Sequence, residues 1–367
     1  MKKLVCLIAS ITIFTNIFTV SAYNTSAKAA VVIDGVTGEI LYSQNCDARL
    51  PMASTTKIMT ALLLCELGGD LTKEIVTTRE MVTVEGSSMG LQVGDTVSYN
   101  DLLYGMMLAS GNDAANTVAI ALGGSVTDFV KLMNERAEKM GLINTNFVTP
   151  SGLDADEHYT TAYELAIITK EALKNEKFAQ AASSKSARLC YGNPPYNRTL
   201  TNHNKLLKMY DDVVGVKTGF TKKSGRCLVS ASKKDGKLVI AVTLNDGNDW
   251  QDHRKILDLG LSLIESKVFS PQKNDVYIAA SNGEQVAGVI PSATISVTKN
   301  TNVKYFISTP YFIYAPIKHG EKIGSITYYC NDNTVIEKPI TAAKDVTYKQ
   351  NKFILFFEIF KALILSV

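Results

Sequence analysis

A serine and a lysine three residues apart, Ser54 and Lys57, stand at the start of an apolar segment that continues to residue 64. On a helix, positions i and i+3 share one face, so these two side chains would lie side by side. A serine at a helix N-terminus also lies at the positive end of the helix dipole, which favours developing negative charge. A neutral lysine there would accept the serine proton, provided that burial or a second cation lowers its pKa. The pair predicts an activated serine nucleophile.

The spacing alone does not distinguish this pair from others. Ser230, Ser270 and Ser296 are each followed three residues later by a lysine, and none of these serines opens a long apolar helix. Considered by itself, Ser54 is better explained as an ordinary N-cap residue beside a solvated lysine. The catalytic interpretation therefore depends on further motifs.

Two such motifs are present. Ser110-Gly111-Asn112 lies between two helical patterns, 56 residues after Ser54, and Lys217-Thr218-Gly219 ends an apolar strand pattern 107 residues further on. Alone, the first is a capping turn, because Ser, Gly and Asn all favour turns. Alone, the second is an edge-strand lysine followed by a turn. Together with the Ser-x-x-Lys pair, they predict one polar site built from a helix start, an interhelical turn and a strand end.

The surrounding segments predict the elements that hold these motifs. Helical patterns cover residues 55–67, 99–108, 113–122, 126–140, 161–173 and 252–265, and glycines end several of them. Strand patterns cover two segments within residues 30–42 and also residues 213–216, 226–232 and 237–245. Strands thus flank a central block of helices. We expect an α/β (α+β) domain in which helices pack against an antiparallel sheet.

The pattern changes after residue 268. Short alternating segments such as residues 293–297, 305–308 and 322–329 are separated by Gly, Pro and Asn. This pattern predicts a small all-β domain over residues 269–349, following a larger domain over residues 23–268.

Both ends of the chain carry apolar segments. Two lysines, an apolar run and Ser21-Ala22 make residues 1–22 a predicted secretory signal peptide, with an uncleaved membrane helix as the alternative. Residues 353–367 are almost wholly apolar, but as a helix they would span about 22 Å, less than the roughly 30 Å hydrocarbon core. We expect residues 350–367 to anchor an exported protein to the outer face of the cytoplasmic membrane, lying in the interface. A terminal helix packed on the domain is the alternative.

Composition excludes several classes of function. Lys and Arg total 38 against 35 Asp and Glu, a balance that gives no electrostatic case for nucleic-acid binding. The six cysteines show no metal-ligand spacing, so we expect no metal and no cofactor. Five cysteines would remain after signal removal, which allows one disulfide without indicating its pair.

The three motifs, in this order and in these contexts, resemble the active-site set of penicillin-recognising serine enzymes. Residues 53–60 and 149–162 also resemble two signatures of the low-molecular-mass penicillin-binding proteins, which are serine-type D-alanyl-D-alanine carboxypeptidases of the peptidase S11 family. The resemblance covers the whole mature chain. It implies a β-lactamase/transpeptidase-like catalytic domain followed by a small all-β domain.

The resemblance also implies a catalytic role for three side chains. Ser54 would be the nucleophile that forms an acyl-enzyme, and Lys57 would be the general base that activates it. Ser110 would relay a proton toward the leaving D-alanine. The implied reaction is removal of the terminal D-alanine from the peptidoglycan stem pentapeptide, with β-lactams as acylating inhibitors.

Five further residues are implied to bind the substrate. Lys217 would bind it and lower the pKa of Lys57 by like charge. Asn112 would contact the substrate peptide, and Thr218 would help to hold its terminal carboxylate. Gly219 would allow close approach of the strand backbone. The backbone N–H group of Phe220, together with that of Ser54, would form the oxyanion hole.

Three positions differ from the family pattern or lie outside the catalytic set. Relatives often place a carboxylate-binding arginine ahead of the last helix of the catalytic domain, and Arg254 is the arginine nearest that position. Phe220 stands where some relatives carry histidine. We expect His158 to be a structural hydrogen-bonding residue.

Two alternatives share the three motifs or part of them. A β-lactamase of class A uses an additional glutamate, for which residues 152–156 offer no convincing equivalent. A non-catalytic penicillin sensor or cell-wall-binding module would not need an intact set of Ser54, Lys57, Ser110 and Lys217.

Overall fold

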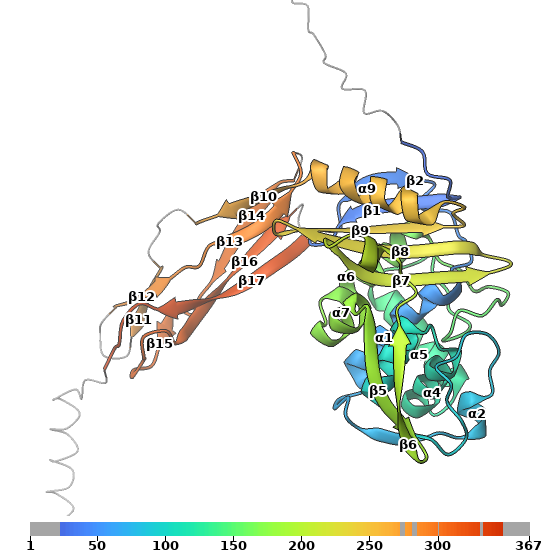
Figure 1. Ribbon diagram of the computed structural model, residues 1–367. Coiled ribbons are helices and arrows are strands. Elements are labelled where there is room, and N and C mark those ends of the chain that lie inside the picture. Colours follow the sequence, from blue (N-terminus) through green and yellow to red (C-terminus); the bar gives the residue numbers. More distant parts are fainter. Residues whose placement is uncertain (1–22, 272–275, 281–284, 300, 331–332, 348–367) are drawn as a thin grey trace, which may run out of the picture.

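A computed structural model describes residues 23–271, 276–280, 285–299, 301–330 and 333–347. These residues form a large mixed domain from which a narrower all-β domain extends (Figure 1). The predicted signal peptide and membrane segment lie outside the described residues. Within the described part of the chain, no helix has the length and apolar character needed to cross a membrane.

The large domain is organised around a five-stranded antiparallel sheet with the order β2-β1-β9-β8-β7. The strands are β1 (Ala29–Asp34), β2 (Ile40–Gln44), β7 (Val213–Thr221), β8 (Gly225–Lys234) and β9 (Lys237–Leu244). Strand β7 forms one edge. The three strands predicted in the second half of the domain are all present, and β7 extends five residues beyond its predicted end at residue 216.

Both faces of this sheet are covered. Along β1, Val31 and Ile33 pack into the core shared with the helical block, whereas Val32 packs into a second core with Leu257 of α9 (Asp249–Leu263). Successive side chains of a strand point to opposite faces, so a strand buried on both faces is apolar throughout. This explains why every residue of β1 is buried.

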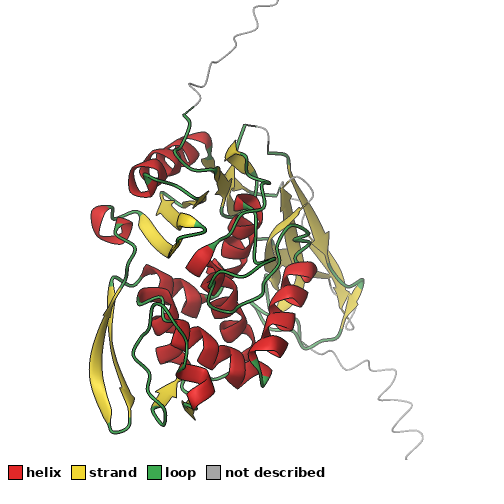
Figure 2. Ribbon diagram, turned by 90° about the vertical axis from the view of Figure 1, so that its right-hand side faces the viewer, coloured by secondary structure: helices red, strands yellow, loops and turns green. Residues whose placement is uncertain are grey.

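A block of helices covers the opposite face of the sheet from α9 (Figures 1 and 2). Its longer helices are α1 (Lys57–Leu67), α3 (Tyr99–Leu108), α4 (Asn112–Gly123), α5 (Val126–Lys139), α6 (Ala162–Leu173) and α7 (Glu176–Ser183). The single turn α2 (Arg79–Val82) also belongs to this block, whereas Leu206 and Leu207 of the single turn α8 (Leu206–Met209) pack into the core on the α9 side of the sheet. Helix α1 is buried from Lys57 through Leu64, which places the predicted site at the centre of the domain.

A second, four-stranded sheet lies beside the helices, with the order β3-β4-β5-β6. It consists of β3 (Glu74–Val76), β4 (Thr96–Ser98), β5 (Ser186–Gly192) and β6 (Pro195–Thr201). Strands β5 and β6 form a long hairpin that projects downward along the helical block (Figure 1).

The C-terminal domain is all-β. Strand β10 (Glu265–Phe269) pairs with β13 (Ala293–Val297), and a six-stranded sheet has the order β14-β16-β17-β12-β11-β15. These strands are β11 (Val276–Ala280), β12 (Gln285–Val289), β14 (Val303–Ser308), β15 (Phe312–Ile313), β16 (Lys322–Cys330) and β17 (Asn333–Ala342). Strand β10 follows α9 directly, a few residues ahead of the boundary expected at residues 268 and 269.

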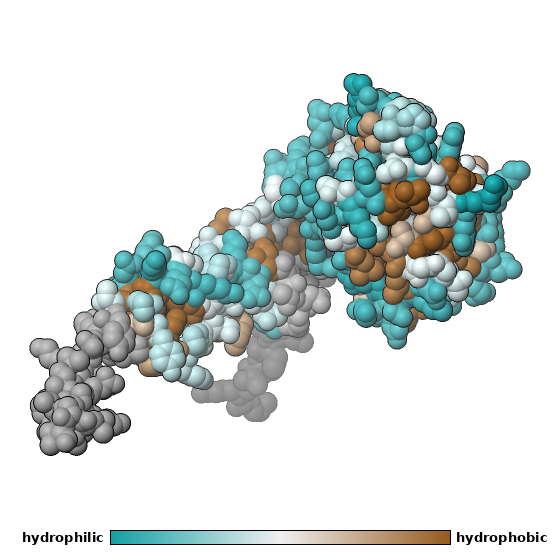
Figure 3. All heavy atoms as spheres, turned by 90° about the horizontal axis from the view of Figure 1, so that it is seen from below, coloured by the Kyte–Doolittle hydropathy of each residue, from teal (hydrophilic) through white to brown (hydrophobic). Residues whose placement is uncertain are grey.

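The two domains have separate cores and meet through polar contacts. The core of the C-terminal domain includes Ile326, Tyr328 and Ile340. At the junction, the Glu39 carboxylate accepts hydrogen bonds of 2.8 Å from the hydroxyls of Thr298 and Thr301. Seen from below, apolar side chains gather on the underside of the large domain, whereas the surface of the narrower domain is mixed (Figure 3).

Candidate active site

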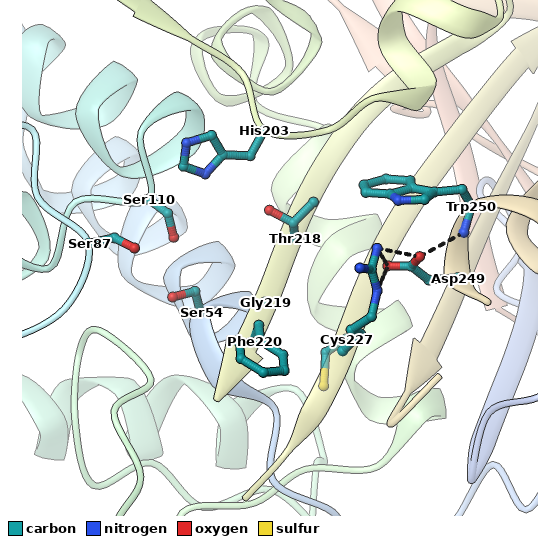
Figure 4. Close-up of a pocket in the computed structure, with 11 residues that line it drawn as sticks. Ser54, Ser87, Ser110, His203, Thr218, Gly219, Phe220, Cys227, Asp249 and Trp250 are labelled. Atoms are coloured by element: carbon teal, nitrogen blue, oxygen red, sulfur yellow. Dashed lines mark hydrogen bonds and ion pairs between the residues drawn. The ribbon is translucent and has the colours of Figure 1, made fainter. Parts of the chain in front are cut away.

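Five of the eight predicted site residues line one cavity of about 450 Å³, and the other three, Lys57, Asn112 and Lys217, are buried outside its lining. Ser54 and Ser110 approach it from the helical block, and Thr218, Gly219 and Phe220 line it from β7 (Figure 4). A pocket between a sheet edge and a helical block brings together residues that are far apart in the sequence.

Ser54 lies in a short 3-10 turn, η1 (Ala53–Thr56), that leads directly into α1. The sequence pattern places the helix start at residue 55, whereas α1 itself begins at Lys57. Ala53, just before Ser54, has a φ of +48°, a left-handed conformation that costs a non-glycine residue energy. Such conformations persist where surrounding contacts enforce them, and they cluster at functional sites.

Two glycines allow η1 to be approached closely. A Cβ atom at Gly219 of β7 would lie 3.1 Å from the backbone nitrogen of Ser54. A Cβ atom at Gly152, whose φ is +85°, would lie only 1.9 Å from the carbonyl oxygen of Ala53. Neither position has room for a side chain without movement of its neighbours.

The Lys57 amine is fully buried and has three polar neighbours. Its Nζ atom lies 2.9 Å from Ser54 Oγ, 2.7 Å from Asn112 Oδ1 and 2.6 Å from the carbonyl oxygen of Ser151. The amide oxygen and the carbonyl oxygen only accept hydrogen bonds, whereas the serine hydroxyl both donates and accepts.

The pKa of Lys57 lies well below the ordinary lysine value. Burial is the largest cause, and the nearby charge of Lys217 adds to it, while Asp113 acts in the opposite direction. Burial also lowers the pKa of Lys217 to about 7. In the structure, Lys217 Nζ donates a 2.9 Å hydrogen bond to the carbonyl oxygen of Thr218. Both amines thus have a much greater tendency to be neutral at physiological pH than a lysine in water.

Ser110 and Asn112 lie at the turn between α3 and α4. Ser110 has a φ of +58°, and its hydroxyl faces Ser54 across the cavity (Figure 4). Asn112 is buried, and both ends of its amide are engaged within the protein: Oδ1 with Lys57, and Nδ2 with the carbonyl oxygen of Glu85 at 2.6 Å. In this structure, Asn112 orients the lysine, whereas the resemblance implies that it contacts the substrate peptide.

The cavity is completed by residues that were not predicted from the sequence. Arg226 of β8 lies at its mouth, with its side chain 44% exposed, and forms a two-pronged ion pair with the buried carboxylate of Asp249. The single tryptophan of the chain, Trp250, lies 5.5 Å from this guanidinium. His203 and Ser87 line the opposite side (Figure 4).

Arg254, the arginine suggested by position along the chain, lies elsewhere. It pairs with Asp212 and Asp258 and is not among the described residues that line the cavity. The chain therefore presents a different arginine, Arg226, to the site. Strand pairing carries it there, and no motif in the sequence marks it.

His158 also lies away from the cavity lining. Its Nδ1 atom accepts a hydrogen bond from the Val148 N–H, and Nε2 contacts the Thr56 hydroxyl at 2.8 Å. Burial lowers the pKa of His158 to about 4. Among the described residues, no cluster of His, Cys, Asp or Glu is arranged to hold a metal ion, and all five described cysteines are free.

Comparison with known proteins identifies the family. Residues 16–248 match the D-alanyl-D-alanine carboxypeptidase family, and residues 253–348 match the C-terminal domain of penicillin-binding protein 5. The chain belongs to the D-alanyl-D-alanine carboxypeptidase family. It is 33% identical to the D-alanyl-D-alanine carboxypeptidase DacF of Bacillus subtilis, with 90% of this chain and 88% of the relative covered. For DacC of Escherichia coli the identity is 31%, with 89% and 86% covered.

Solved structures of carboxypeptidase relatives share the fold. The crystal structure of the D-alanyl-D-alanine carboxypeptidase DacD from Francisella tularensis gives a TM-score of 0.64 at 26% identity, covering 90% of this chain and 95% of that one. The Streptomyces K15 DD-transpeptidase gives 0.64 at 31% identity, covering 66% of this chain and all of that chain. The predicted family, the transpeptidase-like α/β fold with an all-β C-terminal domain, and the serine D-Ala-D-Ala carboxypeptidase activity are confirmed.

Proposed function

We propose that Ser54, Lys57 and Ser110 are the catalytic residues of this carboxypeptidase. The observation that carries the proposal is the hydrogen-bonding geometry of Lys57. A neutral amine has two N–H donors and one lone pair. The Asn112 and Ser151 oxygens can only accept, so they take both donors and leave the lone pair facing the Ser54 hydroxyl. Lys57 is thereby oriented to accept the proton of Ser54.

In the acylation step, Ser54 Oγ attacks the carbonyl carbon of the bond between the two terminal D-alanines while Lys57 Nζ takes its proton. A tetrahedral intermediate forms, in which the carbonyl oxygen carries the negative charge. The C–N bond then breaks, and the leaving amine of D-alanine receives a proton through Ser110. Water later attacks the serine ester, which releases the shortened peptide and regenerates Ser54.

The negative oxygen of this intermediate needs nearby donors. The backbone N–H groups of Ser54 and Phe220 supply them, and Gly219 is the residue that lets β7 lie within contact of η1. Each oxyanion donor in comparable enzymes contributes about 3 kcal/mol.

The substrate's terminal carboxylate binds between Thr218 and Arg226. Thr218 lies on β7 beside the nucleophile, and Arg226 is the arginine that lines the same cavity. Asp249 holds the guanidinium in a fixed orientation through hydrogen bonds of 2.7 and 3.0 Å. Lys217 is buried and hydrogen-bonded to the Thr218 carbonyl, and its protonated form supplies positive charge near the substrate and disfavours the charged form of Lys57.

The same serine reacts with β-lactams, whose strained amide resembles the substrate bond. The competing functions differ in the fate of the acyl-enzyme. A β-lactamase needs a group that drives rapid deacylation, and the carboxylate among the described cavity-lining residues, Asp249, is paired with Arg226. We therefore propose slow β-lactam turnover, and not a β-lactamase or a non-catalytic sensor.

For cellular placement we propose that residues 1–22 direct export and that residues 350–367 attach the protein to the outer face of the cytoplasmic membrane. The domain over residues 23–268 would then act on cell-wall peptides, and the β domain over residues 269–349 would hold it away from the membrane. The supporting features are the apolar patterns at both ends of the sequence. Removing the chain from Lys352 onward should release the protein from membranes, and continued sedimentation with them would exclude this anchor.

The catalytic assignment is tested with Ser54→Ala. This variant should lose both D-alanine release from a pentapeptide and covalent labelling by fluorescent penicillin. Labelling that persists in Ser54→Ala would refute the assignment.

The carboxylate site is tested with a matched arginine pair. Arg226→Gln should raise KM for a peptide with a free C-terminal carboxylate about tenfold or more and affect the corresponding amide less, since it removes a charge-assisted hydrogen bond. Arg254→Gln removes an arginine outside the cavity and should leave that ratio unchanged. Equal effects of Arg226→Gln on acid and amide substrates would exclude the proposed contact.

A further inference from the structure

The loop over residues 85–91 contains none of the predicted site residues, but two of its carbonyl groups accept hydrogen bonds from Asn112. The carbonyl oxygen of Ser87 accepts a 2.7 Å hydrogen bond from the backbone N–H of Asn112, and the carbonyl oxygen of Glu85 accepts one of 2.6 Å from its side-chain amide. Between them, Gly86 has a φ of +88°, and a Cβ atom there would lie 2.7 Å from Asn112 Nδ2. The orientation of the amide that faces Lys57 therefore depends on the position of this loop.

The first half of the loop is exposed, whereas Met89 and Leu91 near its end are buried in the core of the large domain. Residues 85–88 are all exposed, and Gly90 has a φ of +84°. A first set of polar contacts fixes the loop from α4. The Asp113 carboxylate accepts hydrogen bonds of 3.0 Å from the backbone N–H groups of Met89, Gly90 and Leu91. These polar contacts add to the burial of Met89 and Leu91 in fixing the loop, whose exposed residues 85–88 have no apolar burial.

A second set of polar contacts fixes the loop from the β5–β6 hairpin. Arg198 of β6 donates hydrogen bonds to the carbonyl oxygens of Met89, at 3.3 Å, and Gly90, at 2.7 Å. Its guanidinium lies between two aromatic rings, 4.2 Å from that of Tyr191 and 4.0 Å from that of Tyr196. The Tyr191 hydroxyl also donates to the Met89 carbonyl, at 2.6 Å.

This arrangement uses properties specific to arginine. The planar guanidinium stacks on aromatic faces and presents donors in a rigid fork, neither of which a lysine ammonium reproduces. The side chain is only 11% exposed, and Asp95 lies 4.0 Å away. The two tyrosine rings thus fix the Arg198 guanidinium, and its N–H groups donate hydrogen bonds to two consecutive carbonyl groups of the loop.

We propose that Arg198 is a positioning residue for acylation: it fixes the loop over residues 85–91, and this loop holds Asn112 against the Lys57 amine. The inference rests on the proposed role of Lys57 as the proton acceptor. Arg198 lies outside the cavity lining and acts only through the loop. It links the β5–β6 hairpin to the catalytic base by a continuous series of contacts.

Loosening the loop has a consequence for pH dependence. The charged groups that act on Lys57 are Lys217 of β7 and Asp113 of α4, and burial is the largest influence on its pKa. A displaced loop exposes Asn112 and admits water, so the pKa of Lys57 moves back up toward the ordinary lysine value. The neutral amine is then scarcer, and the acid limb of the acylation profile moves to higher pH. A simple loss of folded protein lowers the rate without moving this limb.

The experiment measures acylation by fluorescent penicillin from pH 5 to 10 on the full protein. Arg198→Ala should acylate roughly ten- to a hundredfold more slowly, because small displacements of catalytic groups have effects of this size. Its acid limb should lie at higher pH than that of the wild type. Arg198→Lys, which keeps the charge without the stacking, should show an intermediate loss. Tyr191→Phe, which removes one hydrogen bond to Met89, should show a smaller one in the same direction.

The matched control is Arg188→Ala. Arg188 is an exposed arginine on β5 of the same hairpin, and its replacement should change neither rate nor pH profile. Melting temperatures of all variants identify any that fail to fold, in which case Arg198→Lys and Tyr191→Phe carry the test. Wild-type rates and profiles in folded Arg198 variants, or an equal loss in Arg188→Ala, would overturn the inference. Labelling that persists in Ser54→Ala would overturn the proposed function instead.

Discussion

Replacing Gly152 with alanine tests whether the carbonyl group of Ser151 helps to orient Lys57. The new Cβ atom would lie 1.9 Å from the carbonyl oxygen of Ala53 and 2.8 Å from Thr56 Oγ1. The first neighbour is backbone, so it cannot swing aside as a flexible side chain does. The segment that carries Ser151 and Gly152 must therefore move away from η1.

The geometry sets the size of this movement. An ordinary contact begins near 3.4 Å, so the segment must retreat by about 1.5 Å from the Ala53 oxygen. Since the Ser151 carbonyl oxygen lies 2.6 Å from Lys57 Nζ, this retreat breaks their hydrogen bond. Displacements of about 1 Å near reacting groups cost up to a hundredfold in rate, and we expect acylation to slow by about that factor. The left-handed backbone adds about 1–2 kcal/mol of destabilisation.

The assay is the rate of covalent labelling of Gly152→Ala by fluorescent penicillin, with the melting temperature measured in parallel. Gly141→Ala is the matched control, because Gly141 also has a positive φ, +74°, but a Cβ atom there meets nothing within 4 Å. It should lose about 1–2 kcal/mol of stability and keep its acylation rate. The reasoning fails if folded Gly152→Ala acylates at the wild-type rate, or if Gly141→Ala slows equally.

Three further predictions concern single residues. Burial lowers the pKa of Lys217 to about 7 in the folded protein, against 10.5 for an ordinary lysine. Between pH 7 and pH 10.5 the unfolded chain therefore binds one more proton than the folded protein, and the free energy of unfolding should rise with pH. Urea unfolding of Lys217→Met should show a weaker dependence of this free energy on pH. The pKa of His158 is lowered to about 4, so stability should fall as pH drops from 6.5 toward 4, and melting of His158→Gln should show a smaller fall. Trp250 is the single tryptophan and lines the cavity, so stopped-flow fluorescence should change on β-lactam acylation, and a slow phase retained in Ser54→Ala would contradict this.

The elements that position the motifs could be predicted from the sequence because their patterns are local. The pattern over residues 99–108 predicts a helix, and α3 spans Tyr99–Leu108, where Ser98 caps the first turn. The β5–β6 hairpin and α7 were missed. Residues 186–201 carry alternating polar side chains on an exposed hairpin, and their pairing depends on the adjacent loop and helices more than on an apolar pattern.

The candidate site was predictable only where residue type and order along the chain carried the information. Ser54, Ser110 and Thr218 line one cavity, as their motifs suggested, and Lys57 and Lys217 lie buried beside it. Arg226 could not be predicted, because its place at the cavity results from the register of β8 against β7, where it faces Phe220. The partner of Arg226, Asp249, comes from a helix start 23 residues later.

Strand β7 ends the five-stranded sheet, and an open strand edge is a template for pairing with any extended chain, including another unfolded protein. In this enzyme the open edge is also the wall of the cavity, so it cannot be closed by another strand without loss of access. Lysines at edges discourage sheet extension, and Lys222 and Lys223 are exposed at the end of β7. The lysines in the turn after β7 thus protect against aggregation at a strand edge that must stay open for substrate. Replacing both lysines with neutral residues should make the protein more prone to aggregate and leave its catalytic activity unchanged.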